Sequence, residues 1–138
     1  MKKLSTDNIF SIFDLSDDQP QSQRTKDIDQ CFTALSTVIS GVENYYLLDH
    51  MYTNRYGQSY LDARQSLQVK YFSKLLHYVD RYDEIPSDTV KAVEDKFGSH
   101  AIEFALNDML ECFLGVEQYN HCATIDKLIK IFNVKNLH

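Results

Sequence analysis

The chain has 138 residues, a net charge of −6 and 43% hydrophobic residues, a size and composition typical of one globular domain. The negative charge argues against a general affinity for nucleic acid, because such binding depends on basic side chains that neutralise the phosphates. No apolar run approaches the roughly 18 residues of a membrane span. With only 4 glycines and 2 prolines, a turn-rich β sandwich is disfavoured, so we expect a single all-α domain over residues 1–138.

Residues 1–23 are expected to form an N-terminal arm. Residues 7–15 are strongly apolar and follow a Thr-Asp pair suited to an N-cap, so a short helix that docks on the body is predicted there. A partner-binding peptide is the alternative interpretation. The polar residues 16–23, centred on Pro20, are predicted to connect this arm to the rest.

A first long helix is predicted from near Ile28 to about Asn54. Apolar side chains recur there at steps of three and four residues, which is typical of an amphipathic helix. Gly57 is expected to end it in a left-handed conformation. The stripe consists of Ile28, Cys31, Phe32, Leu35, Val38, Ile39, Val42, Tyr45, Tyr46 and Tyr52.

A second helix, capped by Ser59, is predicted to run to the IPSD sequence at 85–88, where the proline disfavours helix in the residue before it. Ser87 or Asp88 should cap a short third helix, which Gly98 ends. A fourth follows from Ser99, and a last helix is predicted from near Thr124. We therefore expect a bundle of four main and two short helices, which could be arranged as two stacked helical hairpins.

Two pentamers, GVENY at 41–45 and GVEQY at 115–119, suggest an internal repeat. A shift of 74 residues aligns the apolar positions of the two helices. However, any two amphipathic helices can be brought into phase, so both duplication and coincidence stay open. Gly41 and Gly115 are predicted to let another helix approach closely, because glycine within a helix usually has a packing reason. Glu43 and Glu117 are predicted to face solvent.

The three cysteines, Cys31, Cys112 and Cys122, lie in apolar helical patterns. Their odd number and positions predict buried reduced thiols rather than disulfides. The start of the chain, MKKLSTDNIF, has no apolar run of the kind found in a signal peptide. We therefore expect a cytoplasmic protein.

A metal-binding helical-bundle enzyme built around His77, Asp80, Glu117 and His121 is one alternative function. The sequence contains neither the Glu-x-x-His pairs of dimetal bundles nor a zinc-type cysteine spacing. No phosphate-binding loop or nucleophile motif is present either. We expect no metal, no cofactor and no catalytic residue.

A second alternative is a transcriptional regulator that uses a degenerate helix-turn-helix over residues 89–110. Val93, Phe97 and Gly98 fit the corner of such a motif, but Glu94 stands where a small residue is normally found. The expected reading helix opens with Ser99 and His100 and has no arginine or lysine to contact phosphates.

Two segments are candidates for protein recognition. The first segment lies at the predicted corner between the two long helices and is rich in tyrosine and arginine. These residue types are enriched at binding hot spots. Its candidate residues are Tyr52, Arg55, Tyr56, Tyr60 and Arg64.

The second segment, DRYDEIPSD at 80–88, places Asp80, Asp83 and Glu84 near one end of the bundle. Acidic patches speed association with basic partners, although they also serve solubility and helix capping. The leading hypothesis is a non-catalytic module that binds a protein, of the immunity-protein, antitoxin or phage-encoded antagonist type. Its partner would present a basic surface; a homodimer stays open, and neither membrane nor nucleic acid is expected as a partner.

Overall fold

The computed structural model describes the backbone of residues 23–138 and the side chains of residues 30–138. This part of the chain contains five helices and no strand: α2 (Gln23–Tyr56), α3 (Gln58–Asp80), α4 (Ser87–Phe97), α5 (Ser99–Gly115) and α6 (Tyr119–Ile131). The expected all-α fold is confirmed. The predicted helix over residues 7–15 and its connection through residue 22 lie outside the described residues.

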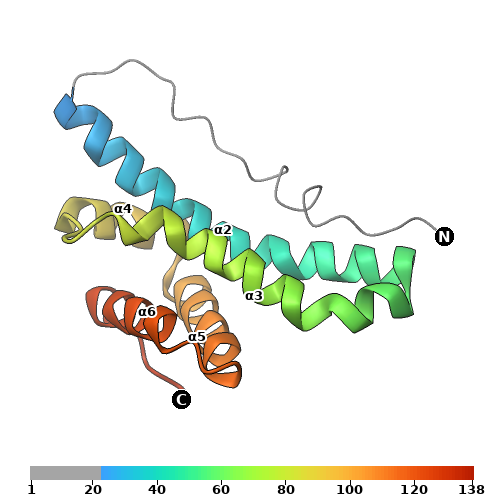
Figure 1. The fold of residues 1–138 in the computed structure, drawn as a ribbon. Coiled ribbons are helices and arrows are strands. Elements are labelled where there is room, and N and C mark those ends of the chain that lie inside the picture. The colour runs from blue at the N-terminus through green and yellow to red at the C-terminus, as the bar shows by residue number, and fades with distance from the viewer. Residues whose placement is uncertain (1–22) are drawn as a thin grey trace.

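The two longest helices, α2 and α3, form an antiparallel hairpin (Figure 1). Gly57 joins them with a positive φ of 57°, as expected of a glycine at a helix end. Helices α5 and α6 pack on each other as a second pair, which contacts the first, while α4 lies against α2. None of the described helices has the length and apolar character needed to cross a membrane.

The hairpin is closely packed where Gly41 faces α3. A Cβ atom at this position would lie 2.6 Å from Cδ2 of Leu75, so only glycine fits without a shift of that side chain. The hydroxyl of Tyr71 donates a hydrogen bond of 2.8 Å to the carbonyl oxygen of Gly41. The predicted close approach is confirmed for Gly41. It is wrong for Gly115, which has open space at its Cβ position.

The core draws on all five helices. Most of its fully buried members come from apolar stripes that the periodicity predicts, because residues three and four apart lie on one helix face. Tyr60 is an exception, since it lies outside the predicted stripes and is 2% exposed. The largest of the fully buried side chains are Tyr60, Phe72, Phe113, Leu35, Leu76, Ile102, Leu106, Met109 and Ile125.

Helix boundaries differ from the sequence predictions at four starts. Helix α2 begins at Gln23 rather than near Ile28. Gly57 and Pro86 occupy the N-cap positions of α3 and α4, and neither helix has a side-chain capping bond, so the predicted caps at Ser59 and at Ser87 or Asp88 are wrong. Helix α6 begins at Tyr119 rather than near Thr124.

The early start of α6 follows from a sharp reversal after α5. Glu117 adopts a positive φ of 58°, and the N–H of Gln118 donates to the carbonyl oxygen of Phe113 at 2.9 Å. This is the hydrogen-bond pattern of a Schellman helix end, in which glycine usually occupies the left-handed position. Because glutamate occupies it here, the sequence gives no glycine signal for the turn.

Candidate protein-binding surfaces

The corner between α2 and α3 is organised around Asp49, a residue that is not among the predicted binding residues. The guanidinium of Arg64 donates two hydrogen bonds to its carboxylate, from Nε to Oδ1 at 2.8 Å and from Nη2 to Oδ2 at 2.6 Å. The hydroxyl of Tyr60 donates a third, of 2.5 Å, to Oδ1. A bidentate arginine pair of this kind is both strong and directional. The corner is therefore held together by its own polar groups.

Ionisation at this corner follows from the same contacts. Burial alone would raise the pKa of Asp49, but the hydrogen bonds from Arg64 and Tyr60 outweigh it and lower that pKa below its usual value. The pKa of Tyr60 is raised, first by burial and then by its bond to Asp49. The corner thus carries a carboxylate, a guanidinium and a neutral phenol at neutral pH.

Tyr60 is 2% exposed, so its prediction as a docking residue is wrong: its ring belongs to the core and its hydroxyl is already bonded. Tyr52 and Tyr56 are half-buried, with their ring centres 5.7 Å apart. Arg64 keeps an exposed edge but is committed to Asp49. Of the five predicted residues at this corner, only Arg55 is exposed without an ion pair among the described residues, its guanidinium 5.7 Å from the ring centre of Tyr56.

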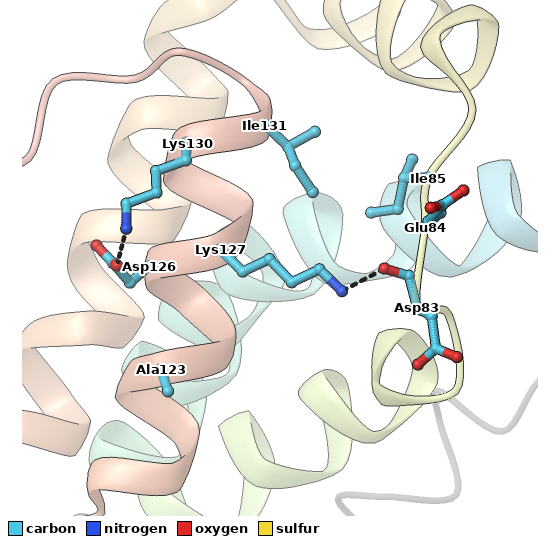
Figure 2. Close-up of a pocket in the computed structure, with 8 residues that line it drawn as sticks. All are labelled: Asp83, Glu84, Ile85, Ala123, Asp126, Lys127, Lys130 and Ile131. Atoms are coloured by element: carbon cyan, nitrogen blue, oxygen red, sulfur yellow. Dashed lines mark hydrogen bonds and ion pairs between the residues drawn. The ribbon is translucent and has the colours of Figure 1, made fainter.

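The second predicted segment lines a groove between the α3–α4 connection and α6 (Figure 2). Its volume is about 600 Å³. Ile85 and Ile131 point toward each other from opposite walls and give the groove an apolar part. The remaining lining residues are Asp83, Glu84, Ala123, Asp126, Lys127 and Lys130.

Lys127 fixes the wall formed by the α3–α4 connection. Its ammonium donates to the backbone carbonyl oxygens of Asp83 at 2.6 Å and Tyr82 at 3.4 Å. The neighbouring Lys130 pairs instead with Asp126 on its own helix, at 3.0 Å. The sequence carries no signal for the bond from Lys127, because the two residues that it joins lie 44 positions apart. The connection is thereby tied to α6 through its backbone.

Lys127 does not use the carboxylates of Asp83 and Glu84, because it bonds to backbone oxygens of the connection. Both residues are exposed, and neither forms an ion pair within the part of the chain that the structure describes. Figure 2 shows the Asp83 carboxylate directed away from Lys127. Asp80 is also exposed, and its Oδ1 accepts a long hydrogen bond of 3.4 Å from Thr124. The predicted acidic residues thus gather at the C-terminal end of α3 and in the connection that follows it, which Lys127 of α6 contacts.

The structure gives little support to a DNA-binding helix-turn-helix over residues 89–110. Gly98 is the only residue between α4 and α5. Helix α5, the expected reading helix, contains no lysine or arginine over its 17 residues. In a complex with DNA, this helix would bring the negative side chains of glutamate and aspartate close to the phosphates, and like charges repel each other.

The four residues of the metal hypothesis do not form a ligand cluster. His121 packs against the ring of Phe113, with centres 4.6 Å apart, and its Nε2 lies 3.4 Å from the hydroxyl of Ser73. Among the described residues, no three histidine, cysteine or acidic side chains converge as a metal ion requires.

The three thiols are free. Cys31 and Cys122 are buried as predicted, whereas Cys112 is half-buried. Burial raises the pKa of each thiol, and with the nearby Asp108 it raises the pKa of Cys112 to about 11. Since the thiolate is the reactive form, these groups are poor nucleophiles at neutral pH.

Comparison with protein-family models, with curated proteins and with solved structures gave no match for this chain. The function is therefore inferred from its own residues alone.

Proposed function

We propose that the protein is a non-catalytic binding module, a small acidic inhibitor that docks on a basic protein surface through the groove between the α3–α4 connection and α6. The observation that carries this proposal is the pair of exposed carboxylates of Asp83 and Glu84, which form no ion pair with any described residue, beside the apolar side chains of Ile85 and Ile131. The proposed inhibitor is of the immunity-protein, antitoxin or phage-encoded antagonist type.

The bond from Lys127 to the carbonyl of Asp83 supports this function physically. It restrains the backbone on which both carboxylates stand, so less conformational freedom is lost on binding. Because the ammonium is used on a carbonyl rather than a carboxylate, the negative charges stay available to a partner. Their field, added to the net charge of −6, would accelerate encounter with a basic surface.

The isoleucines would supply the second part of the interaction. A partner side chain inserted between Ile85 and Ile131 would lose contact with water, and buried apolar anchors carry much of the energy of protein interfaces. The proposal includes a cytoplasmic location, which the three free thiols support.

Site-specific photocrosslinking in the native host tests this proposal. A benzophenone amino acid in place of Glu84, at the groove, should yield one discrete crosslinked protein. The same substitution at Glu94, an exposed glutamate of α4 outside the groove, is the matched control and should not yield it. Equal crosslinking at the two positions, or none at position 84, would remove the groove as the docking surface.

A further inference from the structure

A second surface runs along α2 on the side away from the core. Glu43, Leu47, Met51 and Arg55 are all exposed and follow one another at intervals of four residues. Leu47 is 62% and Met51 60% exposed, high values for large apolar side chains. At 1.5 Å per residue this stripe is about 18 Å long. Side chains spaced by four form one of the ridges by which helices pack together.

The order of side chains in the α2 stripe is self-complementary. It reads acidic, apolar, apolar, basic, and its midpoint lies at residue 49. An antiparallel copy centred on the same point would place Leu47 against Met51 and Glu43 against Arg55, each contact occurring twice. Beside the stripe, Asn44 would face Asn54, two side chains that can hydrogen-bond to each other. A two-fold interface requires this property, because each subunit presents the same patch.

The charges at the two ends of the stripe are available for such a contact. Among the described residues, neither Glu43 nor Arg55 forms an ion pair. We propose that α2 is the interface of a two-fold symmetric homodimer, in which the stripes of two copies pack antiparallel. The stripe shares no residue with the groove, so this inference goes beyond the proposed function, and either can fail without the other.

One exposed helix face buries little surface, so the dimer should be weak and depend on concentration. Sedimentation equilibrium of the full chain over a wide range of concentrations should show a reversible monomer–dimer equilibrium. Leu47→Asp should abolish the dimer. Leu114→Asp, which changes an exposed leucine of α5 outside the stripe, should leave it intact. Circular dichroism would show that both variants are folded.

A charge exchange makes the test specific for the antiparallel arrangement. Glu43→Arg alone and Arg55→Glu alone would each replace two attractive contacts by two repulsive ones and weaken dimerisation on the order of tenfold or more. An equal mixture of the two variants restores both opposite-charge contacts, so it should dimerise at least as well as the original chain. A mixture that stays monomeric would overturn the antiparallel interface. A native chain that is monomeric at every concentration would overturn the homodimer and leave the stripe to another occupant.

Discussion

The two pentamers GVENY (41–45) and GVEQY (115–119) share four of five residues but occupy different structures. The first lies inside α2, with Val42 fully buried and Tyr45 only 6% exposed. The second begins at the last residue of α5 and spans the reversal into α6, so that Tyr119 is 64% exposed. Nearly identical short sequences can therefore differ in conformation and in burial.

The residues around each pentamer explain the difference. Upstream, the aligned positions agree: Leu35 and Met109 are both buried, as are Ile39 and Phe113.

Downstream of the pentamers the two segments differ. After the first pentamer, half-buried tyrosines extend the side of α2 that packs against α3. A straight continuation of α5 would instead place Asn120 and Thr124 on the apolar face. The chain turns back, and Cys122 and Ile125 reach the core. Common descent of the two hairpins stays a hypothesis.

The largest expected contrast concerns the tyrosines that end the pentamers. Tyr45→Ala should lower the free energy of unfolding by about 3–5 kcal/mol, because it leaves a cavity between α2 and α3. Tyr119→Ala should change it by less than about 0.5 kcal/mol, since most of that side chain is in solvent. Urea unfolding of the two variants measures both values. Similar losses would mean that the two pentamers have equivalent environments.

Two aspartates give the hairpins opposite responses to acid. The pKa of Asp49 is lowered in the folded protein, so its stabilising effect is present above its unfolded pKa and is lost as the pH falls through its folded value, below about pH 4. Asp49→Asn should therefore lower the free energy of unfolding by about 1–2 kcal/mol at pH 7, and by progressively less in acid.

Asp108, on α5, has its pKa raised by burial and by the nearby Glu111, although a hydrogen bond from Tyr46 opposes the shift. The stabilising contribution of Asp108 to the fold is fully present below its unfolded pKa and is lost as the pH rises through its folded pKa. Asp108→Asn should consequently gain stability relative to the original chain as the pH rises. Thermal unfolding between pH 3 and pH 7 would reveal the two opposite slopes; parallel slopes would contradict the assignment.

The smallest contrast lies at the central glutamates of the pentamers. Glu117 has a left-handed φ, which costs a non-glycine residue about 1 kcal/mol, so Glu117→Gly should stabilise the protein by up to that amount. Glu43 is inside a regular helix, and Glu43→Gly should destabilise it by about 1 kcal/mol. Melting temperatures that move in the same direction for both would show that the reversal after α5 is not strained at Glu117.

The sequence predicts the fold well because apolar periodicity controls which helix faces are buried. It also identifies Gly41 as a packing glycine and Gly98 as a helix boundary. It fails where a polar contact joins distant positions: Asp49 with Arg64, or Lys127 with the carbonyl of Asp83. Periodicity reports burial but not which polar atoms meet. Tyr60 shows a second limit. It lies next to a predicted turn and outside the apolar stripe, so the sequence predicts it at the surface, whereas in the structure it is 2% exposed and its hydroxyl bonds to Asp49 of α2.

The most direct test of the proposed function is the rate of association with the partner that photocrosslinking identifies. Asp83→Lys combined with Glu84→Lys should slow association by about tenfold or more at low ionic strength. The matched control, Glu94→Lys combined with Asp95→Lys, makes the same change in net charge on exposed residues of α4. If the groove is the docking surface, the control should associate much faster than the groove variant. Equal slowing in the two variants would show that only net charge matters and would contradict docking through the groove.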